Sequence, residues 1–141
     1  MLTPALSNAL SGLNAQKLRL NATASNVANV SSGGAVPGSA QAQAGAPTVY
    51  RPLQVNMTSV TTADGQGAGV FADVTESKNG FSLSYDPDAL GANAEAFVAV
   101  PNVDLAQEAV NLIETKALFK ANAAVIRTQE EMLGSLLDTV G

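Results

Sequence analysis

The 141-residue sequence contains no cysteine, no histidine and no tryptophan. These absences exclude disulfide frameworks and leave no thiol or imidazole for catalysis or for most transition-metal sites. Charged residues make up only 13% of the chain, against about 25% in an average domain. Seven basic residues stand against twelve acidic ones, so a surface for nucleic acid or anionic lipid is not expected. We expect a non-enzymatic protein with no cofactor, no metal and no small-molecule substrate.

Long apolar runs are also missing. No stretch reaches the ~20 apolar residues that a membrane span needs. The sequence starts Met1-Leu2-Thr3-Pro4, and its first basic residue is Lys17, which is unlike a secretory signal. We therefore expect a soluble chain, or one exported without a cleaved signal peptide.

Two short motifs resemble chemical sites. Asp86-Pro87-Asp88 pairs two carboxylates, but without further ligands this pattern is typical of a turn. The glycines of 65–69 lack the spacing and the Lys-Ser/Thr of a phosphate-binding loop, and they precede a predicted strand. Neither motif supports an enzyme.

The first 30 residues predict a helix over 3–29, with Thr3 as N-cap and Pro4 in the first turn. Apolar residues recur at heptad spacing: Leu6, Leu10, Leu13, Leu20 and Val27. The rest of its surface carries amides, including Asn26 and Asn29, rather than the charges of a solvated face. Such a surface suits close packing against other protein.

The middle of the chain, 31–100, predicts a flexible loop followed by a small β region. Residues 31–47 are Gly, Ala, Ser, Gln and Pro without charge, which favours a flexible loop. Period-two alternation over 48–100 predicts three or four short strands. Asp64-Gly65-Gln66-Gly67 predicts a turn, and Asn79-Gly80 predicts a β-hairpin.

The last 41 residues contain the strongest pattern, a helix over 104–140 with Asp104 as N-cap. Its heptad row is Leu105, Leu112, Phe119, Ile126, Leu133 and Val140, and Leu137 lies on the alternate row. On this helix we expect Glu114 to pair with Lys116 and Arg127 with Glu130, as surface or interface ion pairs.

Helix lengths indicate more than a compact monomer. A helix over 104–140 is about 55 Å long and one over 3–29 about 40 Å, whereas a compact 141-residue globule is roughly 37 Å across. We predict an α+β fold in which the terminal helices pair as an antiparallel coiled coil, and about 15 Å of the longer helix projects without an intrachain partner. The expected division is 1–30, 31–100 and 101–141. Burial completed against other subunits is one interpretation, and a monomeric helical hairpin with a small β domain is the other.

Both termini resemble the bacterial flagellar axial proteins. Residues 21–29, Asn-Ala-Thr-Ala-Ser-Asn-Val-Ala-Asn, are similar to the signature of rod and hook proteins. Pro101-Asn102-Val103-Asp104 and the Glu108 to Asn122 region, preceded by Tyr85-Asp86-Pro87, resemble the proximal rod subunits of the FlgC type. The matches cover about half of the chain, in the right order and at the right ends.

The resemblance implies a structural subunit of the basal-body proximal rod, exported by the flagellar type III apparatus and polymerised helically into a torque-transmitting drive shaft across the periplasm. Its partners would be copies of itself, homologous rod proteins, the export apparatus and a rod-base adaptor. Another axial paralogue, a type III secretion needle- or adaptor-like protein, and a small hydrolase or ligand-binding domain are the alternatives. The predicted assembly interface comprises Leu6, Leu10, Leu13, Leu20, Asn26, Val27, Asn29, Leu105, Leu112, Phe119, Asn122, Ile126, Leu133 and Leu137.

Overall fold

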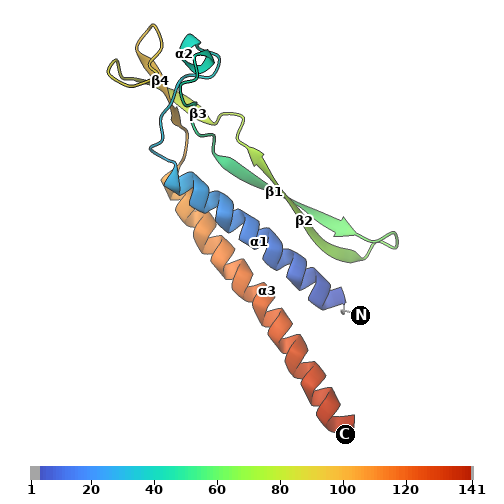
Figure 1. Ribbon diagram of the computed structural model, residues 1–141. Coiled ribbons are helices and arrows are strands. Elements are labelled where there is room, and N and C mark those ends of the chain that lie inside the picture. Colours follow the sequence, from blue (N-terminus) through green and yellow to red (C-terminus); the bar gives the residue numbers. More distant parts are fainter. Residues whose placement is uncertain (1–3, 141) are drawn as a thin grey trace. The chain divides into compact units, whose positions relative to one another are not determined.

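The computed structural model describes residues 4–140, apart from the side chain of Val140. It has the predicted α+β fold, with a long helix at each end and a small β region between them (Figure 1). The elements are α1 (Pro4–Ala28), α2 (Ala40–Gln43), β1 (Leu53–Thr61), β2 (Gly67–Glu76), β3 (Phe81–Tyr85), β4 (Phe97–Pro101) and α3 (Leu105–Val140).

The two long helices begin and end close to the predicted positions. The Asp104 carboxylate accepts hydrogen bonds from the backbone N–H groups of Ala106, at 2.9 Å, and Gln107, at 3.1 Å. It is therefore the predicted N-cap of α3. The cap predicted at Thr3 lies outside the described residues. Within the described part of the chain, no helix is long and apolar enough to cross a membrane.

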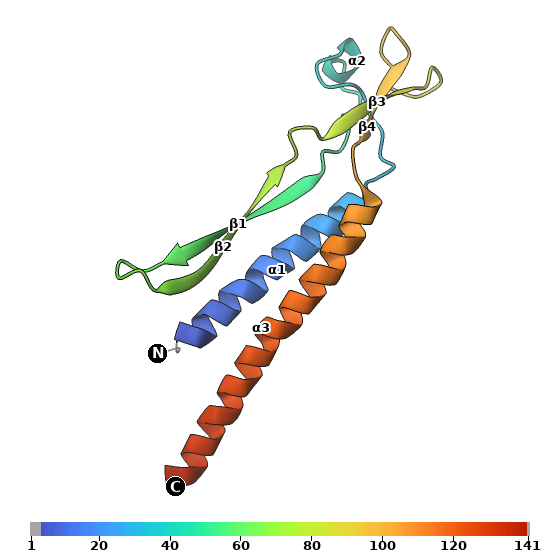
Figure 2. The same ribbon diagram turned by 180° about the vertical axis from the view of Figure 1, so that it is seen from behind.

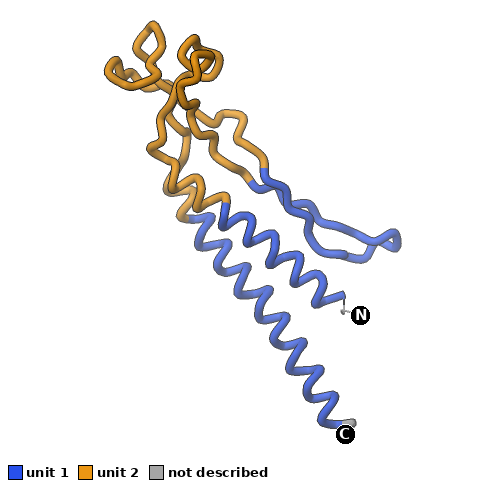
Figure 3. The backbone as a smooth tube through the Cα atoms, viewed as in Figure 1, with its two compact units in different colours: residues 1–21, 55–74, 110–141 blue, residues 22–54, 75–109 orange. Residues whose placement is uncertain are grey.

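The chain forms two compact units, each assembled from segments far apart in the sequence (Figure 3). Unit 1 comprises 1–21, 55–74 and 110–141, and unit 2 comprises 22–54 and 75–109. The division into 1–30, 31–100 and 101–141 follows chain order and stays a prediction.

The β region consists of two two-stranded sheets, β1–β2 and β3–β4. The predicted turn after β1 is confirmed, because the Thr62 N–H donates to the Gln66 carbonyl at 2.8 Å and Gly65 adopts φ +76°. The hairpin predicted at Asn79-Gly80 is wrong. β3 pairs instead with β4, antiparallel from Phe81 opposite Pro101 to Tyr85 opposite Phe97.

The turn at 78–79 has another role in unit 2. Asn102 donates its backbone N–H to the Gly80 carbonyl, at 3.1 Å, and its side-chain amide to the Asn79 carbonyl, at 3.2 Å. Gly80 does not adopt a positive φ, which a tight Asn-Gly hairpin requires. The long-range contacts of 97–102 thus outweigh the local turn preference.

The segment 31–47, expected to be a flexible loop, contains the single helical turn α2, whose N-cap is Ser39. Two isolated β-bridges join Gly34 to Ala99 and Ala35 to Thr48. Ala35 and Ala99 are fully buried. The segment is therefore connected to the β3–β4 sheet through its first half.

Candidate assembly interface

Within unit 1, residues 4–21 of α1 lie beside the α3 segment that begins at residue 110, in antiparallel orientation, and the end of α3 continues beyond α1 (Figures 1 and 2). Ala9 and Ala15 of α1 are buried. A Cβ atom at Gly12 would lie 2.7 Å from the Asn122 side-chain oxygen, so the glycine permits this close approach. At this point of the seam between the two helices, a small residue therefore allows the backbone of α1 to lie close to α3.

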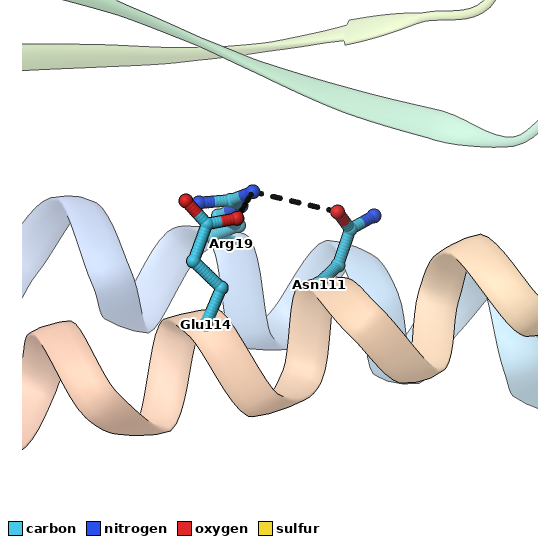
Figure 4. Close-up of polar contacts among 3 residues, drawn as sticks. All are labelled: Arg19, Asn111 and Glu114. Carbon is cyan, nitrogen blue, oxygen red and sulfur yellow. Dashed lines mark hydrogen bonds and ion pairs between the residues drawn. The ribbon is translucent and has the colours of Figure 1, made fainter.

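An ion pair connects the helices on one side of this seam (Figure 4). The Arg19 guanidinium lies 2.7 Å from the Glu114 carboxylate and 3.4 Å from the Asn111 side-chain oxygen. The predicted Glu114–Lys116 pair is therefore wrong. The predicted partner of Arg127 is also wrong, because Arg127 pairs with Glu131, at 3.5 Å. Both observed pairs are partly exposed, and each contributes no more than about 1 kcal/mol.

Most of the predicted interface residues lie on the surface of their unit. Their exposed fractions range from 43% at Leu20 to 75% at Leu137. The exposed members are Leu10, Leu20, Val27, Leu105, Leu112, Phe119, Leu133 and Leu137. Leu6, Leu13, Asn29, Asn122 and Ile126 are partly buried, and only Asn26 is fully buried. The heptad leucines are thus left largely uncovered by the chain itself.

The far end of α3 packs against no other helix or strand among the described residues. Every residue from Glu130 to Thr139 is exposed, and at 1.5 Å per residue this stretch is about 15 Å long. We call residues 130–139 the overhang. It carries four exposed large apolar side chains, Met132, Leu133, Leu136 and Leu137. The projecting helix end that the sequence predicted is therefore present.

A groove of about 500 Å³ opens between α1 and α3 in unit 1. Leu20, Leu112 and Phe119 provide its apolar surface, and Gln16 and Thr115 are buried beside it. Three exposed lysines complete the lining: Lys17, Lys116 and Lys120. We call this site the lysine groove. In the described structure, none of the three ammonium groups forms an ion pair.

Asn26 is the main hydrogen-bonding residue of unit 2 and is only 2% exposed. Its amide nitrogen donates to the Leu53 carbonyl, at 2.9 Å, and to the Glu108 carboxylate, at 2.6 Å. Its oxygen accepts from the Leu53 N–H, at 2.7 Å, and from the Tyr50 hydroxyl, at 2.9 Å. One side chain thereby joins the end of α1, the start of β1 and the first turn of α3.

Several residues at the candidate interface were not identified from the sequence. Val110, Ile113, Val125, Met132 and Leu136 are large, apolar and exposed, but lie outside the seven-residue rows that we followed. A count of all apolar residues around each helix would have found them. The contact of α1 with the β1–β2 hairpin was also missed: Asn8 donates to the Gly67 carbonyl and the Val70 N–H donates to Ser11. The i, i+3 spacing of Asn8 and Ser11 was the available signal.

The two motifs that resembled chemical sites have structural roles. The Asp86 carboxylate accepts the Asp88 N–H at 3.2 Å, as expected for a turn. The glycines of 65–69 form the end of the β1–β2 hairpin and the start of β2. The described residues contain no group of three carboxylate, histidine or cysteine side chains that could hold a metal ion.

Two protein families match the ends of the chain. Residues 6–35 match the family described as flagella basal body rod protein, and residues 94–139 match the flagellar basal body rod FlgEFG protein C-terminal family. The flagellar basal-body rod protein FlgC of Escherichia coli O6:H1 is 38% identical over 125 residues, covering 87% of this chain and 86% of the relative. The chain belongs to the FlgC family of flagellar basal-body rod proteins.

Other FlgC relatives extend the similarity across distant bacteria. FlgC of Borreliella burgdorferi is 32% identical, with 92% of this chain and 91% of the relative covered. FlgC of Bacillus subtilis is 30% identical, with 91% of each chain covered. The resemblance stated for both termini is thus confirmed, and it extends through the middle of the chain. The family matches include Asn26 and Asp104, the two side chains that fix the ends of the long helices.

Proposed function

We propose that this FlgC-family chain forms the proximal rod by helical polymerisation through its terminal helices. Members of the family are structural subunits of the basal-body rod, and this chain is one of them. In our proposal the polymer is part of the drive shaft that crosses the periplasm and transmits torque. The chain performs no catalysis in this role.

The observation that carries the proposal is the exposed apolar surface of α3. Leu112, Phe119, Leu133 and Leu137 are between 45% and 75% exposed. Contiguous exposed apolar surface of this kind marks interaction sites in soluble proteins. Burial against neighbouring subunits supplies the apolar contacts that the chain does not make itself. Asn26 acts within the subunit in this scheme, by holding the two helix ends together.

The partners that we propose are other copies of the chain, homologous rod proteins and a rod-base adaptor. We further propose that the chain travels to the rod through the flagellar export apparatus without a cleaved signal peptide. A subunit whose terminal helices gain most of their burial on docking is well suited to this route, because isolated helices are only marginally stable. Folding and docking would then occur together.

The test is to locate the chain in purified basal bodies and to compare two substitutions of exposed apolar residues. Phe119→Asp inserts a carboxylate into the proposed interface, and this uncompensated charge should weaken docking at least about a hundredfold. We expect basal bodies without the chain and non-motile cells, while immunoblots still detect the exported variant. The matched control is Leu90→Asp, at a residue 91% exposed in unit 2, which should assemble and swim normally.

Two results contradict the proposal. Absence of the wild-type chain from purified rods would favour an adaptor-like protein outside the rod. Normal swimming by the Phe119→Asp strain would show that this face of α3 is not a packing surface.

A further inference from the structure

The only Asn-Gly pair of the sequence is Asn79-Gly80, in the unit 2 turn between β2 and β3. Asparagine is a chemically labile residue, because the backbone nitrogen of the next residue can attack its side-chain amide carbon. Glycine has no Cβ to hinder that attack. Every other asparagine of the chain precedes alanine, valine, leucine or methionine. The pair that does not form a hairpin is therefore the place where this chemistry is least hindered.

Both reacting groups of the turn are without a hydrogen-bond partner. The Asn79 side chain is exposed, and its amide forms no hydrogen bond with the described residues. The Gly80 N–H donates to no acceptor in that part of the chain, although Gly80 is buried. Buried N–H groups are nearly always paired, so this nitrogen is an exception. No hydrogen bond made by either group has to break before they react.

A positive charge lies near the same peptide. The Nε atom of Arg51 would lie 3.2 Å from a Cβ atom at Gly80, and its Nη2 atom donates to the Lys78 carbonyl, at 3.2 Å. The contact of Arg51 with the Glu76 carboxylate is long, at 3.8 Å, and partly exposed, so it compensates little of the charge. A fixed cation stabilises the negative charge that develops on the attacking nitrogen and on the oxygen of the intermediate.

Asn102 restrains the peptide group that has to move. Its side-chain amide donates to the Asn79 carbonyl, at 3.2 Å, and its backbone N–H donates to the Gly80 carbonyl, at 3.1 Å. The Asn79 carbonyl and the Gly80 nitrogen belong to one planar peptide group, so a bond to the oxygen also fixes the direction of the nitrogen. Because Gly80 is buried and the Asn79 side chain is exposed, the nitrogen must turn outward to attack. The side-chain bond of Asn102 must open for this local motion.

We propose that Asn79 is a site of spontaneous deamidation whose rate is set by the hydrogen bond from the Asn102 side chain. The Gly80 nitrogen loses its proton and bonds to the Asn79 amide carbon, while the side-chain nitrogen leaves that carbon and takes up a proton to become ammonia. Water then opens the succinimide at either carbonyl and gives aspartate or isoaspartate at position 79. Each product adds a negative charge to a chain of net charge −5, and isoaspartate also converts the carbonyl that Asn102 binds into a free carboxylate.

The first experiment measures the reaction at each asparagine. The purified full-length chain is incubated in mildly alkaline buffer, and peptide mapping by mass spectrometry follows the exchange of amide for carboxylate. We expect Asn79 to react at least about tenfold faster than any other asparagine, because only Gly80 leaves the attacking nitrogen unhindered. The matched control is Asn79→Gln, which keeps an exposed amide but forms the larger cyclic intermediate far more slowly. A rate at Asn79 no higher than at the other asparagines overturns the proposal.

The second experiment tests the restraint by Asn102. Asn102→Ala removes the bond to the Asn79 carbonyl and keeps the backbone N–H, so the rate at Asn79 should rise by about two- to tenfold, the factor that one hydrogen bond contributes. Asn102→Asp keeps the size of the side chain but cannot donate, and should show the same rise. The matched control is Asn29→Ala, which removes another amide-to-carbonyl bond of unit 2 and should leave the rate at Asn79 unchanged.

Hydrogen exchange separates a local restraint from general unfolding. In both Asn102 variants, protection of 22–54 should stay at the wild-type level while the rate at Asn79 rises. An unchanged rate in these variants, an equal rise in the Asn29→Ala protein, or a rise that accompanies lost protection throughout unit 2 overturns the role of Asn102. The result is independent of the rod function, because the reaction takes place within one subunit.

Discussion

The two units of the molecule differ in the contacts that hold them together. Unit 2 is held together largely by polar contacts between its own residues, above all the four hydrogen bonds of Asn26. It also buries Ala35, Val98 and Ala99 around β4. Unit 1 buries small residues, Ala9 and Ala15, and leaves Phe119 and Leu137 exposed. In unit 1, large apolar side chains of α3 therefore lie where the chain does not cover them.

This difference indicates which part of the molecule completes its folding within one subunit. Buried polar groups whose partners are all present rigidify a structure, whereas exposed helices with few buried apolar contacts open easily. We therefore infer that unit 2 is the more protected part of an isolated subunit and that α3 in unit 1 gains its protection on docking. Hydrogen exchange measures this order directly.

Among the substitutions that test this difference between the units, Asn26→Ala should have the largest effect on stability. It leaves the N–H and carbonyl of Leu53, the Tyr50 hydroxyl and the Glu108 carboxylate without this partner. Because unpaired buried groups each cost about 1–3 kcal/mol, we expect the free energy of unfolding of unit 2 to fall by about 3 kcal/mol. Urea unfolding and hydrogen exchange of 22–54 and 75–109 measure the loss.

The matched control is Asn29→Ala. Asn29 lies just beyond the end of α1, is partly buried, and donates to the Ser25 carbonyl at 2.9 Å. Its loss should cost about 1 kcal/mol or less. Equal effects of the two substitutions would contradict the central role of Asn26 in unit 2.

A smaller effect is expected at the helix seam of unit 1. Gly12→Ala should gain up to about 1 kcal/mol of helix propensity, but its Cβ would lie within 3.0 Å of the Asn122 amide. The two effects oppose each other, so the single substitution should leave stability unchanged or lower it. Asn122→Ala removes the obstacle, and in the Gly12→Ala background it should raise stability by about 1 kcal/mol. Thermal unfolding of the four proteins in a double-mutant cycle gives this coupling. Additive effects would show that the helices are not in close contact at Gly12.

Much of the helical architecture could be predicted from the sequence, because its signals are local. The heptad rows and the Asp104 cap gave the bounds of α3 within about one residue, and the lengths of the helices implied the overhang. The turn at Gly65 was equally local, since it requires a positive φ that glycine adopts freely.

Strand pairing and the seam could not be predicted in this way, because they depend on contacts between distant segments. β3 pairs with β4 across the 86–96 loop, where Tyr85 and Phe97 form an edge-to-face contact with ring centroids 5.7 Å apart. No local sequence signal favours this pairing over the hairpin that Asn79-Gly80 predicts. The close contact of Gly12 with Asn122 carries no hydrophobic signal, so hydrophobic periodicity indicated the uncovered face of the helices instead of this contact. The sequence around Asn26 does not indicate its three partner residues, since they lie 24 to 82 residues away.

The smallest expected effect is a loss of unit 2 stability at high pH through Tyr50. Burial raises the pKa of its phenol above the ordinary 10.0; the Ser25 side-chain hydrogen bond lowers this pKa, whereas the Glu108 and Glu76 carboxylates raise it. Because the folded state favours the protonated phenol, its contribution is fully present below about pH 10 and is lost as the pH rises through the folded pKa. Urea unfolding from pH 9 to 11 should show a smaller decline for Tyr50→Phe than for the wild type. The matched control is Tyr85→Phe, which removes an exposed tyrosine of the same unit. An identical decline in the Tyr50→Phe protein would mean that the hydrogen bond from the Tyr50 hydroxyl to Asn26 does not form in solution. Unit 2 would then be less well ordered in the isolated subunit than its hydrogen bonds imply.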